Sequence, residues 1–377
     1  MRHKPERVSP RRRTPSLLAL LQAAAQGRRD LPLTAFTDAQ ISWAVDTGLG
    51  PLLMYTTAAA SQGTNSPHRP LLQGAELTAR LLTAETLDAM EEMLDVCAGH
   101  VPPLTLLKGI SIGTQYYPAP HLRPMRDLDV LVDREAVPHV EALLGTLGYR
   151  QQSSHPERTS ATNHHGTPFF HPSRGLWVEI HWGLFSSRIP VAADRVFSLD
   201  HVRSQLRPST FAGRAVMRLS PELQIVYIAA HWARDLRRIG GMVAMLDLLY
   251  LLRQTGATVQ WDQLFVWLHG SAAAIYLNLL LTYLVRAGLI DLAPELLRDL
   301  WRTQHSLNRA NLRLLHRFID WHLVSGQQGM ASYPLWLSGP PARNLCHAAW
   351  ALFSAWRARS GLLKSNLLKY LRNRSRP

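Results

Sequence analysis

Two aspartates stand two residues apart in residues 127–132, which read Asp-Leu-Asp-Val-Leu-Val. The alternation predicts a β-strand with Asp127 and Asp129 on one side and the apolar residues on the other. Such a rigid pair of carboxylates suits a hard divalent cation, because Mg²⁺ takes oxygen ligands and commonly binds one or two carboxylates together with substrate phosphates. Asp127 and Asp129 are therefore predicted to be metal ligands.

A second strand with an acid in its centre is predicted at residues 176–182, Leu-Trp-Val-Glu-Ile-His-Trp. Trp177, Glu179 and His181 share one of its faces. An ionisable glutamate in such an apolar strand is costly unless it has a partner, and a metal held by the two aspartates would be that partner. Glu179 is thus the predicted third carboxylate, while His181 is interpreted as an orienting or core histidine.

Cationic side chains lie close to the aspartates in sequence, at Lys108, Arg123 and Arg126. Transfer of a phosphoryl or nucleotidyl group needs charge neutralisation and in-line positioning more than covalent help. Two metals clamped by three carboxylates stabilise the attacking and leaving oxygens, and arginine binds phosphate in a bidentate manner. The pattern therefore predicts chemistry on a nucleoside triphosphate.

The elements that must position these residues follow from periodicity. Helical spacing is found at 15–27, 38–47 and 71–98, and the last of these carries an apolar stripe. The Asp127 strand is flanked in sequence by four predicted elements: a strand (104–107), a helix (110–117) and a loop (118–125) before it, and a helix (134–147) after it. Gly148 is expected to end this last helix. A strand pair at 168–171 and 176–182 follows, and 190–213 is expected to be irregular or mixed. The stripe consists of Leu77, Leu81, Ala84, Leu87, Met90, Leu94 and Cys97.

The C-terminal part of the chain is predicted to be helical, and the helices are expected at residues 221–236, 242–253, 261–268, 272–287, 294–301 and 308–324. A Gly/Pro/Ser-rich stretch at 326–344 and a last amphipathic helix at 345–356 follow it. The predicted domains are a disordered basic tail (1–14), an N-terminal helical region (15–100), a catalytic core (101–215), a helical domain (216–325), and a loop, final helix and basic tail (326–377).

The composition narrows the classes of function. The formal net charge of +14 is concentrated in basic ends, but solvated tails are the commoner outcome, so nucleic-acid binding is not favoured. Two cysteines exclude a disulfide scaffold and fit a reducing cytoplasm. The longest stretch without a charged residue, 263–285, is interrupted by His269, Gly270 and Asn278, so two packed helices are expected rather than a membrane span. Histidines 155, 164, 165 and 171 lack zinc-ligand spacing and are assigned to a polar loop.

The motifs together resemble the uncharacterised nucleotidyltransferases of the DNA-polymerase-β-like superfamily, which are often encoded beside polysaccharide or peptide biosynthesis genes. The resemblance covers roughly residues 100–270. It is carried by Leu107-Lys108-Gly109, Tyr117-Pro118, the run Arg123-Pro124-Met125-Arg126-Asp127-Leu128-Asp129, Leu147-Gly148-Tyr149-Arg150 and Val178-Glu179-Ile180-His181-Trp182, and more loosely by Ser220-Pro221-Glu222, His231 and Leu246-Asp247.

The resemblance implies an α+β fold: a small mixed β-sheet core with flanking helices, an N-terminal helical segment and a C-terminal helical domain. It also implies that Asp127 and Asp129 bind Mg²⁺ (or Mn²⁺) and the nucleotide phosphates, with Glu179 near the acceptor as metal ligand or base. Gly109 and Ser111 stand where the superfamily has a Gly-Ser turn that approaches phosphate, and Lys108 supplies a point charge there.

The activity so implied is transfer of NMP from an NTP to a hydroxyl or phosphate of a small-molecule, sugar or peptide acceptor. The acceptor is expected between the core and the helical domain, with His181 and His231 on its side. Two alternatives stay open. One is a protein- or RNA-modifying, toxin-like nucleotidyltransferase. The other is a non-catalytic scaffold that keeps the fold, although a scaffold has no need of three facing carboxylates.

Overall fold

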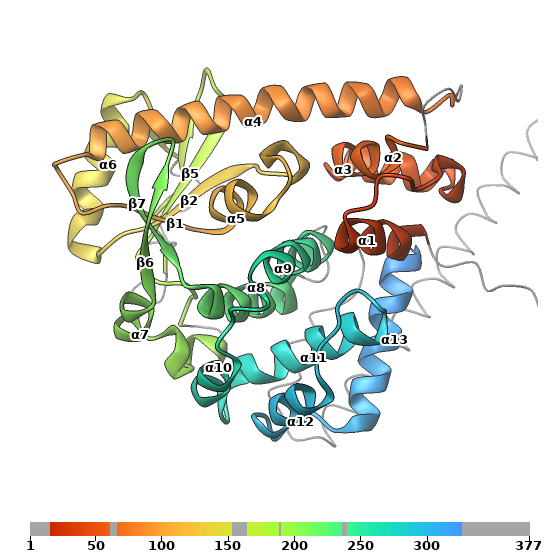
Figure 1. Ribbon diagram of the computed structural model, residues 1–377. Coiled ribbons are helices and arrows are strands. Elements are labelled where there is room, and N and C mark those ends of the chain that lie inside the picture. Colours follow the sequence, from red (N-terminus) through yellow and green to blue (C-terminus); the bar gives the residue numbers. More distant parts are fainter. Residues whose placement is uncertain (1–15, 61–65, 153–163, 188–189, 236–239, 326–377) are drawn as a thin grey trace, which may run out of the picture.

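The computed structural model describes residues 16–60, 66–152, 164–187, 190–235 and 240–325. Within these ranges the chain forms thirteen α-helices and one seven-stranded mixed sheet, which confirms the predicted α+β class (Figure 1). The basic tails and the predicted final helix at 345–356 lie outside them. The helices are α1 (Ser16–Gln26), α2 (Asp38–Asp46), α3 (Gly50–Thr57), α4 (Arg69–Cys97), α5 (Lys108–Tyr116), α6 (Val137–Thr146), α7 (Leu199–Ser204), α8 (Pro221–Asp235), α9 (Gly240–Thr255), α10 (Trp261–Leu268), α11 (Ala272–Arg286), α12 (Pro294–Arg302) and α13 (Arg309–Ser325).

The sheet has the strand order β3-β4-β5-β2-β1-β7-β6. Strand β2 pairs in parallel with β5, and β1 in parallel with β7, whereas the other neighbours are antiparallel. The two strands with the candidate catalytic residues, β2 and β5, are therefore direct neighbours in the centre of the sheet. The strands are β1 (Thr105–Leu106), β2 (Asp127–Leu131), β3 (Arg150–Gln151), β4 (Phe169–His171), β5 (Leu176–His181), β6 (Leu206–Phe211) and β7 (Arg214–Leu219).

One face of the sheet is covered by α6 and the C-terminal half of α4. Leu128 and Val130 of β2, together with Val178 and Ile180 of β5, are buried there in one hydrophobic cluster. A second cluster joins α1, α3, α8, α9 and α11. Helix α5 lies between the sheet and α9, as Figure 1 shows. The opposite face of the sheet, which carries the acids, thus faces the helical part of the molecule.

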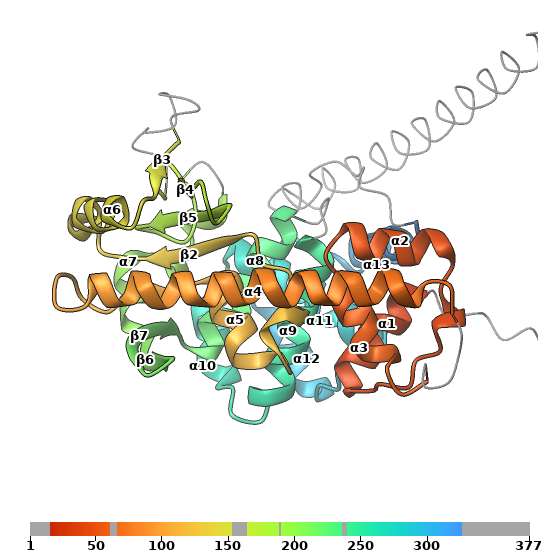
Figure 2. The ribbon, with the colours of Figure 1, turned by 90° about the horizontal axis from the view of Figure 1, so that it is seen from above.

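Helix α4 runs along the whole molecule, from α2 and α3 at one end to α6 at the other (Figures 1 and 2). At a rise of 1.5 Å per residue its 29 residues span about 43 Å. The predicted apolar stripe packs only in the second half of this helix. Met90, Leu94 and Cys97 are buried, but Leu77 and Leu81 are 60% and 64% exposed. The apolar stripe is thus exposed in its first half, because this part of α4 bridges two parts of the molecule.

Residues 190–213, for which the sequence predicts irregular or mixed structure, contain regular elements. That region contains α7 and strand β6, which forms a hairpin with β7 at the edge of the sheet. The two turn residues, Ala212 and Gly213, both have positive φ, 48° and 81°. Such a turn matches the twist of the strands but usually carries Asn-Gly or Asp-Gly, so the Ala-Gly sequence gave no hairpin signal. Strand β7 ends at Leu219 and so crosses the predicted domain boundary at 215.

The other predicted elements of the centre and the C-terminal part are confirmed within a few residues. The loop expected at 118–125 contains one turn of 3₁₀-helix, Pro120–Leu122. Helix α6 ends as predicted, because Gly148 adopts a φ of 89°, in which L-residues are strained. None of the described helices has both the length and the apolar character needed to cross a bilayer.

Candidate active site

The acids of β2 and β5 stand side by side because the two strands pair in parallel and in register. Asp129 lies opposite Glu179, Asp127 opposite Trp177, and Leu131 opposite His181. Since alternate residues of a strand point the same way, the four ionisable side chains share one face of the sheet. The sequence predicted each strand's alternation, and the pairing of the strands brings the two predicted acidic faces together.

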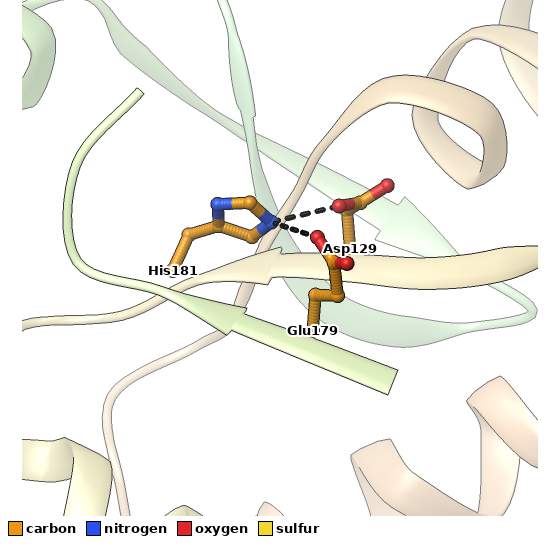
Figure 3. Close-up of side chains that lie close together, drawn as sticks. All are labelled: Asp129, Glu179 and His181. Carbon is orange, nitrogen blue, oxygen red and sulfur yellow. Dashed lines mark hydrogen bonds and ion pairs between the residues drawn. The ribbon is translucent and has the colours of Figure 1, made fainter. Parts of the chain in front are cut away.

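Asp129 is the centre of this group and is only 1% exposed. The Nε2 of His181 donates to its Oδ1 at 2.7 Å and lies 3.5 Å from Oε2 of Glu179 (Figure 3). The ammonium of Lys108 donates to the same Oδ1 at 2.6 Å and lies 3.9 Å from Oε2 of Glu179. Two carboxylates are therefore held together by one ammonium and one imidazole.

These contacts set the protonation of the group. Burial acts to raise the pKa of Asp129, but Lys108 and His181 outweigh burial and hold this pKa well below its usual range. The hydrogen bond from His181 lowers the pKa of Glu179. Burial acts to lower the pKa of His181, but its hydrogen bonds to Asp129 and Glu179 outweigh that effect and raise it. The pKa of Lys108 is raised as well, since Asp129 overcomes the effect of burial. The contacts thus favour the ionised forms of the two acids and the protonated forms of the two bases.

Asp127 differs from the other three groups. Its carboxylate is half-buried and forms no hydrogen bond or ion pair with any residue in the described ranges. Burial, together with the negative charge of Asp129, raises its pKa to about 6. Asp127 is consequently the one acid of this face without a hydrogen bond or ion pair to the described residues.

Lys108 occupies a backbone position that few residues tolerate. One residue, Leu107, separates it from β1 and donates its N–H to the carbonyl of Asp129, and Lys108 then starts α5 with a φ of 43°. A non-glycine residue in this left-handed region is uncommon, and such residues often mark functional sites. The turn directs the lysine side chain back across the face of β2, onto Asp129.

Gly109 is required by a close approach of two side chains. A Cβ added there would lie 2.7 Å from Nη1 of Arg123 and 3.1 Å from Cγ of Met125. Arg123 is in turn fixed by Asp247 of α9, to which its Nε and Nη2 each donate at 2.8 Å. Tyr117 donates to the same carboxylate at 2.8 Å. Arg123 therefore ties the segment before β2 to the helical region, and it lies near enough to Asp127 to oppose the rise of its pKa.

The other predicted phosphate contacts lie away from the acids. Ser111 is fully buried; its hydroxyl accepts from Gln115 at 3.1 Å and its carbonyl accepts from Arg218 of β7 at 2.8 Å. Arg126 is exposed and lines a hollow of about 570 Å³ formed with α4 and the start of α3. Of the five predicted phosphate-binding residues, the structure brings only Lys108 into contact with Asp129.

A cavity of about 130 Å³ adjoins the group on the side of the helical region. Lys108, Arg123 and Asp247 line one end, and α8 contributes Gln224, Tyr227, Ile228 and His231. Of the two predicted acceptor-side histidines, His231 lines this cavity, whereas His181 contacts the acids instead. The polar residue that sequence reasoning missed here is Gln224, which lies in the middle of an ordinary amphipathic helix.

The donor set of the acidic face fits a divalent cation. One ligand atom each of Asp129, Glu179 and His181 can be chosen so that all lie within 4.8 Å of one another, and no other such group of three or more was found in the described part of the chain. Carboxylate oxygens suit Mg²⁺ and Mn²⁺, and imidazole is a further ligand for transition metals. The sequence predicted Asp127, Asp129 and Glu179 as the metal ligands. The group found in the structure contains His181 in place of Asp127.

Two more histidines lie near this set. The rings of His164 and His165 have centroids 5.4 Å and 5.2 Å from that of His181. His165 forms an isolated β-bridge with His181. The sequence assigned both to a polar loop, and only the pairing beside the end of β5 brings them to the site; His155 lies outside the described residues.

Comparison with protein families agrees with this geometry. The model of an uncharacterised nucleotidyltransferase family matches residues 37–287, which is more than half of the chain. The chain belongs to this family. The match contains α5, β2, β5 and α8, and with them every residue of the acidic face. Nucleotidyltransferases generally use an NTP and a divalent metal. No curated protein and no solved structure was found to match the chain.

Proposed function

We propose that this nucleotidyltransferase is Mg²⁺-dependent, or Mn²⁺-dependent, and transfers NMP from an NTP to a hydroxyl or phosphate of a small-molecule, sugar or peptide acceptor, as a step of biosynthesis. The observation that carries the proposal is the in-register pairing of Asp129 with Glu179 on the buried, charged face of β2 and β5. Adjacent carboxylates of which one is fully buried are costly unless cations compensate them, so a role in chemistry explains this pair better than a role in stability.

The roles follow from these positions. Asp129, Glu179 and Asp127 are proposed to hold the cation, with His181 either orienting Asp129 or joining the ligand set. A bound divalent cation would neutralise the charge that develops on the phosphates. Asp127 fits such a role because its carboxylate has no hydrogen bond or ion pair among the described residues and its pKa, about 6, lets it ionise at neutral pH.

Phosphate binding is assigned first to Lys108, whose ammonium lies between the acids and the cavity. When a cation occupies the acids, the lysine is free to contact a phosphate oxygen as a point charge. Arg126, which is exposed, and Gly109 remain proposed contacts. Arg123 serves chiefly to position this segment, and Ser111 would have to leave its buried hydrogen bonds to reach a phosphate.

The experiment is incubation of the full chain with each of the four NTPs, Mg²⁺ or Mn²⁺, and a heat-treated cell extract as the source of acceptor, followed by measurement of pyrophosphate release above that of the extract alone. We expect metal-dependent release that stops on chelation and is lost in Asp129→Asn. Asp262→Asn, at an exposed position on α10, is the matched control and keeps the wild-type rate. Absence of pyrophosphate release with all four NTPs and both metals would refute the proposal and favour the non-catalytic scaffold.

A further inference from the structure

A buried amide in the cavity beside Lys108 lacks a hydrogen-bond partner. Gln224 is 1% exposed and lines this cavity, and its Nε2 has no partner among the described residues. Burying an unsatisfied amide costs roughly 1–3 kcal/mol, so such a group is expected to meet an oxygen acceptor in the functional complex. The nearby carboxylate of Asp247 does not accept a hydrogen bond from this amide, because it is paired with Arg123.

The cavity is small, and both aliphatic and polar side chains line it. Its volume of about 130 Å³ is room for roughly four water molecules, well below the roughly 300 Å³ at which ordinary small-ligand sites begin. Aliphatic side chains form much of the wall, contributed by Ile112, Ile228, Val243 and Ala244. A slim aliphatic arm with an oxygen fits this space, whereas a nucleoside or an intact sugar ring does not.

The position of the cavity connects it to the acids. Lys108 lines it and at the same time donates to Asp129, so a group bound in the cavity lies directly beside the charged face. We infer that the cavity is the acceptor subsite and takes a small aliphatic hydroxyl group, such as a serine or threonine side chain or the end of a short polyol, with Gln224 donating to an oxygen of that group. This inference rests on the proposed function and names its acceptor class.

The reaction that follows is balanced. The acceptor oxygen forms a bond to the α-phosphorus of the NTP, the bond between that phosphorus and the α–β bridging oxygen breaks, and pyrophosphate leaves. The hydroxyl proton passes to a base or to solvent. Gln224 is a binding residue for the arm and takes no part in the bond changes.

The test uses the full-length chain, Mn²⁺ and NTP labelled in the α-phosphate, with three probes present separately. N-acetylthreonine amide and glycerol carry aliphatic hydroxyls on slim arms, and adenosine carries hydroxyls on a bulky ring. We expect label on one or both of the slim probes and not on adenosine. Label on the amide alone would identify a side chain as the arm, and label on glycerol alone would identify a polyol.

Two variants examine Gln224 directly. Gln224→Leu and Gln224→Met remove the donor at similar volume and should each lower kcat/KM for the labelled probe about fivefold to tenfold, mainly through KM. The thermal unfolding midpoint of each variant establishes that it is folded, and Gln263→Leu, at an exposed position on α10, is the control without an effect.

The outcomes separate the two proposals. If the wild-type chain releases no pyrophosphate from any NTP even with the cell extract as the source of acceptor, the proposed function itself is wrong, and the inference falls with it. If pyrophosphate is released but adenosine is labelled as well as the slim probes, or none of the three is labelled, the acceptor class is wrong. If folded Gln224 variants label the probe as the wild type does, the assignment of Gln224 is wrong.

Discussion

The two faces of β2 and β5 are formed by alternate residues of the same strands, but one face stabilises the fold and the other carries charged groups at a cost in stability. On one face Leu128, Val130, Val178 and Ile180 are at most 1% exposed and pack against α4 and α6. Burial of each such side chain stabilises the fold by roughly 1.5–3 kcal/mol. On the other face charged groups are buried at a cost, which only their mutual pairing offsets. The apolar face thus fixes the register of the strands, and the register fixes the distance between Asp129 and Glu179.

The largest effect is expected from Asp129→Asn. This change removes the acid that both Lys108 and His181 contact, and we expect metal-dependent turnover of NTP to fall at least about 1000-fold, equivalent to about 4 kcal/mol of transition-state stabilisation. Pyrophosphate release measures it. Retention of more than about a tenth of the wild-type rate would show that the charged face is not the site of chemistry.

The second prediction distinguishes a positioning ion pair from a phosphate contact. Arg123→Met leaves Asp247 without its bidentate partner in a site where both side chains are about nine-tenths buried, so we expect a loss of about 3–5 kcal/mol in the free energy of unfolding. Denaturant titration of Arg123→Met, Asp247→Asn and the double variant gives the coupling energy. A large rise in KM for NTP with unchanged stability would instead assign Arg123 to phosphate.

The third prediction concerns the apolar face. Ile180→Ala deletes buried atoms next to Glu179 and His181 in sequence but on the opposite side of the strand, and should cost about 2–5 kcal/mol of stability. The folded protein should bind Mn²⁺ with nearly the wild-type affinity. Loss of Mn²⁺ binding at full stability would contradict the separation of the two faces.

The smallest effect depends on pH and concerns Asp127. Its pKa of about 6 lies above the ordinary value of 3.8, so the metal-free folded state binds the proton more tightly than the unfolded state. Stability should therefore fall as the pH rises from about 4 to about 6. Asp127→Asn should remove this dependence and gain roughly 1–2 kcal/mol at pH 7 in the presence of a chelator. Urea titrations at pH 4 and pH 7 measure it, and an equal effect at both values would refute it.

The sequence was sufficient to predict which residues of each strand share a face. It was not sufficient to predict how the two strands pair. Alternation predicted that Asp127 and Asp129 share a face, and likewise Glu179 and His181. It did not show that β2 and β5 are neighbours with Asp129 opposite Glu179, because register depends on side chains far apart in the chain. For the same reason the sequence did not show that His181, interpreted as an orienting or core residue, lies in the group that could hold a metal ion.

The features that escaped prediction each depend on tertiary context. The positive φ of Lys108 is stabilised by its ion pair with Asp129, which no local pattern indicates. The exposure of Leu77 and Leu81 follows from the way α4 bridges two parts of the molecule. Gln224 is distinguished only by the cavity around it, since its helix has ordinary amphipathic spacing.

The most direct test of the charged face is Mn²⁺ binding, followed by electron paramagnetic resonance on the metal-free chain. We expect saturable Mn²⁺ binding to the wild type. We expect binding at least about tenfold weaker in Asp129→Asn and in Glu179→Gln, and wild-type binding in the Asp262→Asn control. Equal Mn²⁺ affinity in the wild type and Asp129→Asn, or no binding to the wild type, would contradict the claim that this face holds the catalytic cation.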